Sequence, residues 1–188
     1  MSAGKGPGIR ITGGTFRGRV LAVPPGARPS EGRVREALFS IWGDRLSGAR
    51  LLDLFAGSGA VGFEAAGRGA LRVVAADADP LALAAMAANA AKLGPGLIEI
   101  RKLSLPTGLA RLASAGERFD LVFADPPYAF DAYSGLLQAV APLLAPDGEA
   151  VVEHSARHRL PAEAGDLVQT DVRRYGECGL SFYRRGAG

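Results

Sequence analysis

The sequence predicts an α/β fold in which a mostly parallel sheet carries helices on both faces. From residue 50 onward, short apolar runs alternate with helical segments, and such repeated β-α units require parallel strands joined by crossover helices. The apolar runs are continuous rather than alternating, which is typical of strands buried on both faces. The length of 188 residues suits one such domain with a small appendage.

The appendage is expected at the N-terminus. Residues 9–11 and 19–23 predict a short β-hairpin, which a proline-rich connector follows. Ser30 can cap a helix that continues to about Leu46. The predicted apolar face of this helix consists of Val34, Leu38, Ile41 and Trp42.

Seven strands are expected in the rest of the chain. The last two form an antiparallel hairpin at one edge, and the others are parallel because helices connect them. Pro80 in the first turn and Gly94 just past the end delimit the best-defined helix. The strands are predicted at residues 50–55, 71–76, 97–101, 119–124, 149–153, 167–175 and 180–184. The helices are predicted up to residue 67 and at residues 80–93, 107–115 and 131–144.

Composition excludes several classes of site. A single cysteine, Cys178, rules out an intrachain disulfide framework and a cysteine-cluster zinc site. Two histidines, His154 and His158, argue against a histidine-rich centre, so no metal is expected. No run approaches eighteen apolar residues, and the first residues lack the apolar segment of a signal peptide. A cytoplasmic protein with no membrane partner is therefore expected.

Positive charge is concentrated near the N-terminus. Residues 1–50 hold nine basic and three acidic residues, whereas the remaining chain holds 13 basic and 16 acidic residues. Most of the cations are arginines, whose planar fork binds phosphate. This asymmetry indicates a basic extension, residues 1–49, that faces an anionic partner, and a main domain, residues 50–188.

A glycine-rich turn follows the first strand of the main domain. Asp53 lies near the end of that strand, and Gly57, Gly59 and Gly62 follow in a G-x-G-x-x-G spacing that opens a helix. Such a turn lets a nucleoside-bearing ligand approach the backbone at the carboxyl ends of parallel strands. A dinucleotide would bring its pyrophosphate close to the Asp53 carboxylate, whereas a cationic amino-acid group suits that carboxylate.

The second strand also ends in a carboxylate. Asp77 follows Gly59 by eighteen residues and can accept hydrogen bonds from two ribose hydroxyls. Asp53, the glycine turn and Asp77 together resemble the S-adenosylmethionine site of class I methyltransferases. The resemblance implies this cofactor, with contacts from Asp53, Phe55, Ala56, Gly57, Ser58, Gly59, Asp77 and Ala78.

The fourth strand leads into Asp125-Pro126-Pro127-Tyr128. The two prolines fix φ and hold a short extended loop whose carbonyls point outward as acceptors. An exocyclic amine of a nucleic-acid base is a poor nucleophile, because its lone pair is delocalised into the ring. The Asp125 carboxylate and the Pro126 carbonyl would bind the amine hydrogens and aim the lone pair at the methyl group. Tyr128 would stack on the base, which must first be flipped into the pocket.

Two N-terminal segments indicate which methyltransferase family the sequence resembles. Residues 10–19, RITGGTFRGR, and residues 28–39, RPSEGRVREALF, resemble the opening of the bacterial RsmD family. The resemblance extends over residues 53–62, 125–128 and 175–183. It implies a Rossmann-like class I methyltransferase that acts on N2 of a guanine in 16S ribosomal RNA. The RNA would be presented within the small ribosomal subunit or an assembly intermediate.

Further residues receive a role only from this resemblance. The position that faces the adenine falls at Leu103 and Ser104 after the third strand, and Asp125 also borders the cofactor. The N-terminal extension would contact RNA phosphates, which position an RNA without reading its sequence. The candidate RNA contacts are Arg10, Arg17, Arg19, Arg28, Arg33, Arg35 and Tyr128.

Three other interpretations stay open. The motif at residues 125–128 also fits transfer to adenine N6 or cytosine N4 in RNA or DNA, or to a protein glutamine. A non-catalytic RNA-binding or assembly factor could retain the same fold. A nucleotide-dependent oxidoreductase could use the G-x-G-x-x-G turn.

Overall fold

The computed structural model describes residues 8–26 and 32–186. Its parallel strands are β3 (Arg50–Leu54), β4 (Arg72–Asp77), β5 (Glu99–Lys102), β6 (Phe119–Ala124) and β7 (Leu144–Ser155). They lie side by side in the order β5-β4-β3-β6-β7. Because the order of the strands reverses at β3, the ends of β3 and β6 border the crevice where open α/β sheets bind ligands.

The C-terminal edge of the sheet is antiparallel, as predicted. Strand β10 (Cys178–Arg185) pairs with β7 on one side and with β9 (Leu167–Tyr175) on the other. A two-residue strand, β8 (Glu163–Ala164), pairs with β9 and makes the sheet eight-stranded rather than seven-stranded. So short a strand carries no readable periodicity. Strand β7 begins at Leu144, earlier than predicted, because its first residues pair with β6 across a register shift.

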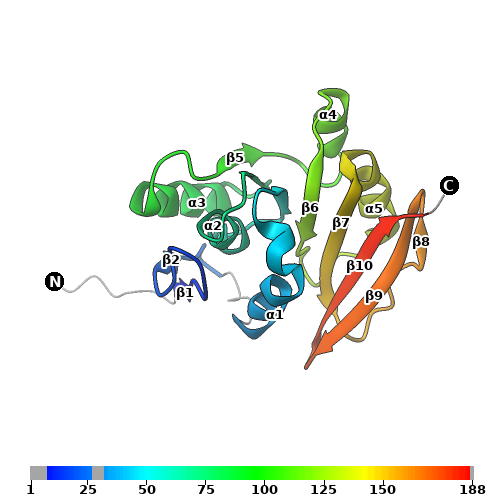
Figure 1. The fold of residues 1–188 in the computed structure, drawn as a ribbon, viewed down its shortest axis with the longest axis horizontal. Coiled ribbons are helices and arrows are strands. Elements are labelled where there is room, and N and C mark those ends of the chain that lie inside the picture. Colours follow the sequence, from blue (N-terminus) through cyan, green and yellow to red (C-terminus); the bar gives the residue numbers. More distant parts are fainter. Residues whose placement is uncertain (1–7, 27–31, 187–188) are drawn as a thin grey trace.

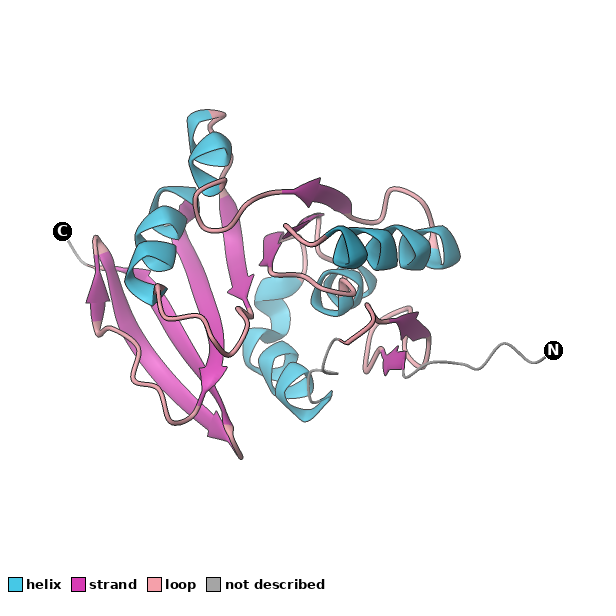
Figure 2. Cartoon of the chain, turned by 180° about the vertical axis from the view of Figure 1, so that it is seen from behind, coloured by secondary structure: helices cyan, strands magenta, loops and turns pink. Residues whose placement is uncertain are grey.

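Helices cover both faces of the sheet (Figures 1 and 2). One core cluster packs against α1 (Gly32–Trp42), α2 (Ala60–Gly67) and α3 (Pro80–Leu93). The cluster on the opposite face packs against α4 (Leu109–Ser114) and α5 (Tyr133–Val140). Two short 3-10 helices, η1 (Gly43–Leu46) and η2 (Ala141–Leu143), continue α1 and α5. No helix in the described part of the chain is both long and apolar enough to cross a bilayer.

The N-terminal hairpin packs directly against the main sheet's helical layer. Strands β1 (Gly8–Arg10) and β2 (Val20–Ala22) pair antiparallel, which confirms the predicted hairpin. The Asn89 side chain on α3 accepts a hydrogen bond from Ala22 N at 2.8 Å and donates one to Ala22 O at 2.9 Å. Leu21 is buried in the same core cluster as Leu51 of β3. The extension therefore shares the hydrophobic core of the main domain.

Helix α1 buries its predicted apolar residues except Ile41, which is exposed. Phe39 is buried instead, and its ring meets Trp42 edge-on with 5.7 Å between centroids. The residue predicted to cap this helix, Ser30, lies outside the described residues. The spacing i, i+3, i+4, i+7 explains which side chains turn inward. The stripe with this spacing consists of Arg35, Leu38, Phe39 and Trp42.

Candidate active site

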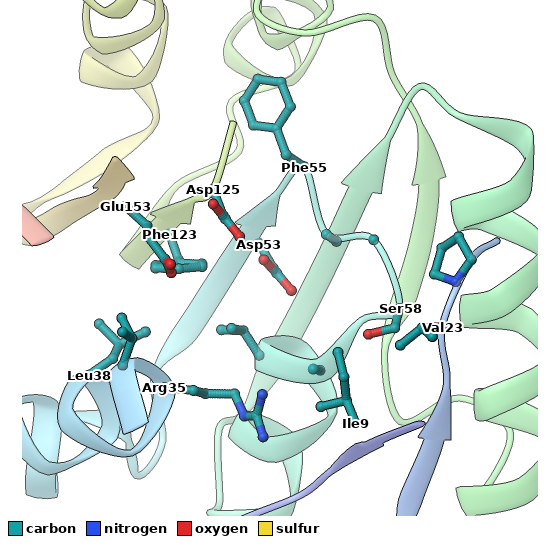
Figure 3. A pocket seen from close by; sticks show the side chains of 16 residues that line it. Ile9, Val23, Arg35, Leu38, Asp53, Phe55, Ser58, Phe123, Asp125 and Glu153 are labelled. Carbon is teal, nitrogen blue, oxygen red and sulfur yellow. The ribbon is translucent and has the colours of Figure 1, made fainter. Parts of the chain in front are cut away.

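A pocket lies where β3 and β6 end, beneath α1 and the N-terminal hairpin (Figure 3). Its enclosed part measures about 90 Å³, which suits a small group rather than a whole nucleoside. Six residues of the predicted cofactor site line it: Asp53, Phe55, Ala56, Gly57, Ser58 and Asp125. The walls that sequence analysis missed come mainly from the extension and β7, and they include Ile9, Val23, Arg35, Leu38 and Glu153.

The glycine turn between β3 and α2 keeps the backbone open to this pocket. Phe55 has a φ of 56°, a left-handed conformation that costs a non-glycine residue about 1–3 kcal/mol and is typical of functional sites. Gly57 also has a φ of 56°, and a Cβ there would meet nothing within 4 Å. A Cβ on Gly59 would lie 2.9 Å from the Phe63 ring. The turn thus leaves a free space beside Gly57 and packs closely at Gly59.

Asp77 holds the turn in place from the end of β4. Its Oδ2 accepts a hydrogen bond from Gly57 N at 2.9 Å, and its Oδ1 accepts one from Asp79 N at 3.0 Å. Each carboxylate oxygen keeps a further acceptor position, so both can still receive a hydroxyl. Leu103 N donates to Asp77 O at 3.0 Å, which brings the segment after β5 beside Asp77. In that rim, Ala78 and Ser104 are exposed.

Asp53 is a carboxylate buried in β3. Its Oδ2 accepts a hydrogen bond from Gly62 N at 3.1 Å. Burial, together with the charges of Asp125 and Asp77, raises the pKa of Asp53 to about 8. A Cβ on Gly62 would lie 3.4 Å from that oxygen, so the third glycine of the motif keeps helix α2 close to the strand. The site therefore favours a cation, which would stabilise the ionised carboxylate.

Asp125 is the first residue after β6, and its N–H donates to Leu54 O at 3.3 Å. Burial raises the pKa of Asp125 to about 7. Pro126 is buried behind it, whereas Tyr128 is 57% exposed at the tip of the loop. Burial raises the pKa of Tyr133 too, and the charge of Asp125 adds to that effect. The loop thus presents one partly buried carboxylate to the pocket and one exposed ring to the protein surface.

Known proteins are similar to this chain in both sequence and fold. The family described as Conserved hypothetical protein 95 matches residues 9–184 of the chain. The chain belongs to this family, the RsmD family. A relative in Escherichia coli strain K12, Ribosomal RNA small subunit methyltransferase D, is 34% identical over 187 residues. The match covers 95% of this chain and 91% of that relative.

Solved structures confirm the predicted Rossmann-like fold class. The YhhF protein of Escherichia coli has a TM-score of 0.80 and 30% identity, over 97% of this chain and 100% of that one. A protein of Thermus thermophilus has a TM-score of 0.82 and 37% identity, over 94% of this chain and 99% of that one. Membership of the RsmD family makes the chain an S-adenosylmethionine-dependent methyltransferase.

One residue of this RsmD-family protein is not where sequence analysis expected it. Arg35 is 4% exposed, so the prediction that it contacts RNA phosphates from the surface is wrong. Its Nε donates to Glu64 at 3.1 Å, and its Nη1 is buried without a hydrogen-bond partner in the part of the chain that the structure describes. The signal was present in the sequence, because Arg35 precedes Leu38 and Phe39 by one helical turn on the buried stripe.

The other predicted RNA contacts in the described part of the extension are at the surface. Arg10 is exposed, and its Nη1 donates to Gly18 O at 2.9 Å. Arg17, Arg19 and Arg33 are exposed as well. Arg28 lies outside the described residues. Their roles stay predictions.

Glu64 on α2 is the buried anion that joins the extension to the main domain. Besides Arg35, it accepts hydrogen bonds from Thr12 N at 3.0 Å and from Arg68 Nη2 at 2.7 Å. Its side chain is 0% exposed. One carboxylate therefore satisfies donors from the hairpin, from α1 and from its own helix.

Glu64→Gln is expected to lower the free energy of unfolding by about 2 kcal/mol, because it weakens hydrogen bonds to charged groups inside the protein. For a chain of this size, the melting temperature should fall by roughly 4–8 °C. Thermal unfolding followed by circular dichroism would measure the change. Glu36→Gln on the exposed face of α1 is the matched control. Equal melting temperatures for the two variants would contradict the role given to Glu64.

Proposed function

We propose that this protein transfers the methyl group of S-adenosylmethionine to the exocyclic N2 amine of a guanine in small-subunit ribosomal RNA. The observation that supports the proposal is that Asp53 and Asp125 line the same pocket at the ends of β3 and β6. The name of the Escherichia coli relative supports the RNA class. The reaction would take place in the cytoplasm, on the small subunit or an assembly intermediate.

The enclosed pocket has a charge pattern that fits the amino-acid end of the cofactor. Arg35 brings an unpaired buried N–H, and Asp53 brings a buried carboxylate. An amino acid carries a carboxylate and an ammonium group, which match these two side chains in sign. The space left free at Gly57 would accommodate the chain that joins this end to the sugar.

The nucleoside would lie along the open rim beside β4 and β5. Asp77 would accept hydrogen bonds from the two ribose hydroxyls. Phe55, Leu103 and Ser104 would border the adenine. Bound in this way, S-adenosylmethionine supplies an electrophilic methyl carbon on a positively charged sulfur.

Asp125 and Pro126 would orient the target amine. One amine hydrogen would bond to the Asp125 carboxylate and the other to the Pro126 carbonyl, so that the nitrogen lone pair points at the methyl carbon. The bond from carbon to nitrogen forms as the bond from carbon to sulfur breaks. The methylated amine then releases one proton, which the Asp125 carboxylate can accept because its pKa lies near 7.

Mass mapping of ribosomal RNA tests this proposal directly. The protein would be incubated with labelled S-adenosylmethionine and either protein-free small-subunit RNA, purified small subunits or DNA. We expect label in N2-methylguanosine from RNA. Label in adenine, cytosine or a protein glutamine instead would replace the substrate assigned here, and no label in any substrate would remove the catalytic assignment.

Tyr128→Ala is expected to raise KM for the RNA by about 10-fold, because stacking of a base on an aromatic ring contributes about 1–3 kcal/mol. The exposed side chain contributes little to folding, so the melting temperature should stay unchanged. Steady-state kinetics on small-subunit RNA would measure the effect. Tyr128→Phe keeps the ring and is the control. If both variants raise KM equally, the hydroxyl rather than stacking matters.

A further inference from the structure

A groove, here called the C-terminal groove, lies between the loop at residues 156–162 and the strands β9 and β10. Its volume is about 630 Å³. The polar residues that carry the argument are His154, His158, Arg159, Arg173, Arg174 and Ser181. None of the described residues that line the groove is acidic. The groove is thus a concave basic surface outside the pocket at Asp53.

Two of its cations have no anionic partner to neutralise them. Arg173 Nε donates to Asp171 at 2.6 Å, so its charge is largely balanced. Within residues 8–26 and 32–186, neither Arg159 nor Arg174 takes part in an ion pair. Both are exposed at the groove. A free guanidinium at a concave surface is a natural phosphate ligand.

His154 lies at the base of the groove, beside these positive charges. Its Nδ1–H donates to Ser155 O at 2.8 Å, and Ser181 Oγ–H donates to its Nε2 at 2.8 Å. Burial lowers the pKa of His154, and the neighbouring His158 and Arg174 lower it further. The histidine is therefore neutral, and the net charge of the groove comes from its arginines.

The groove lies at the same edge of the sheet as the proposed active site. Ala124 of β6 pairs with Val152 of β7, so Asp125 and His154 both lie at the same carboxyl edge of the sheet. A row of edge-to-face rings connects the two places. The centroid distances are 5.6 Å from Phe55 to Phe130, 5.2 Å from Phe130 to Tyr133 and 6.3 Å from Tyr133 to His158.

We propose that the C-terminal groove binds the phosphates of the RNA strand that flanks the target base. This inference rests on the proposed function, in which the base lies at Asp125. The groove is on the face of the sheet that α5 covers, whereas the hairpin and α1 lie on the other face (Figure 2). The RNA would therefore be held on both sides of the flipped base. Unpaired cations beside a base-stacking site are typical of single-strand binding.

A charge-reversal pair tests the groove in the full-length protein. Arg159→Glu with Arg174→Glu should raise KM for small-subunit RNA about 10-fold or more. The slope of the logarithm of the binding constant against the logarithm of the salt concentration should become shallower by about one to two. The control, Arg111→Glu with Arg118→Glu, changes the same charge at exposed positions on α4 and just before β6, which do not line the groove. The Kd for S-adenosylmethionine and the melting temperature should match the control.

Direct binding separates this inference from the proposed function. Fluorescence anisotropy with a fragment of small-subunit RNA measures Kd without catalysis. If the wild type methylates RNA but groove and control variants have the same KM and Kd, the groove assignment fails alone. If the groove variants lose activity only on assembled subunits and bind free RNA normally, the groove contacts a ribosomal protein and the phosphate assignment is wrong. If the wild type leaves RNA unmethylated, the proposed function fails, and the anisotropy comparison still decides the groove.

Discussion

Asp125→Ala is expected to lower kcat for methyl transfer by about 10³-fold, or about 4 kcal/mol of activation free energy. The carboxylate would both orient the amine and accept its proton, and no second carboxylate follows β6 before the exposed Asp131. The Kd for S-adenosylmethionine should change much less, because the cofactor contacts assigned to Asp53, Arg35 and Asp77 remain. Single-turnover kinetics with labelled S-adenosylmethionine would measure the chemical step.

Asp131→Ala is the matched control, since it removes a carboxylate from the same loop at an exposed position. Asp125→Asn should retain part of the orientation, because its amide oxygen still accepts a hydrogen bond, but it loses the proton acceptor. Unchanged turnover in Asp125→Ala would remove the mechanism proposed here. If Asp125→Ala is already unfolded at the assay temperature, unfolding rather than loss of the carboxylate explains the lost activity.

Asp53→Asn is expected to have opposite effects on cofactor affinity and on stability. Loss of the carboxylate should weaken S-adenosylmethionine binding by about 10- to 100-fold, because a hydrogen bond between charged groups contributes about 1.5–3 kcal/mol. The ligand-free variant should be more stable than the wild type at neutral pH. An amide keeps the hydrogen bond from Gly62 N and has no charge to bury.

The pH dependence follows from the raised pKa of Asp53. The carboxyl has a pKa of 3.8 when unfolded and about 8 when folded, so the unfolded chain ionises first as pH rises. The stability that the protonated carboxyl contributes is complete below about pH 4 and is lost progressively up to about pH 8. In the ligand-free protein, Asp53→Asn should therefore raise the melting temperature at pH 7.5 by about 3 °C or more.

Cofactor binding should show the reverse trend with pH. The ligand's ammonium group requires an ionised Asp53, so affinity should rise from pH 6 to about pH 8. Above that range an α-amino group loses its own proton, and affinity should fall. Calorimetry at pH 6, 7 and 8 would measure Kd and the proton released on binding. Asp53→Asn should remove most of the slope, and an unchanged slope would assign the titration to Asp125 instead.

Several elements were predictable because their signals are local. Helix α3 has its predicted bounds, since Asp79 caps it, Pro80 occupies its first turn and Gly94 ends it. Strand β6 also has its predicted bounds, because a continuous apolar run ends at the Asp125 motif. The backbone preferences of a few neighbouring residues decide such features. The glycine turn was predictable too, because the G-x-G-x-x-G spacing indicated a backbone that a ligand can approach.

The exposure of residues on α1 was less predictable, because periodicity defines a stripe without fixing its exact rotation. A one-position rotation exposes Ile41 and buries Arg35. A buried arginine requires an anion, and Glu64 comes from a helix 29 residues along the chain. The sequence contains Arg35 and Glu64, but it does not show that the two form an ion pair.

The sequence by itself determined the parallel sheet, the antiparallel hairpin and the carboxylates at the ends of three strands. These features follow from short-range patterns of apolar residues, glycine and proline. Only the tertiary structure decided that the extension closes the pocket and that Arg35 lines it beside Asp53. It also decided that the loop at residues 156–162 forms a basic groove with β9 and β10. Those features depend on which distant surfaces pack together to remove apolar area from water. Neither charge pairing nor pocket shape is encoded in any one segment of the chain.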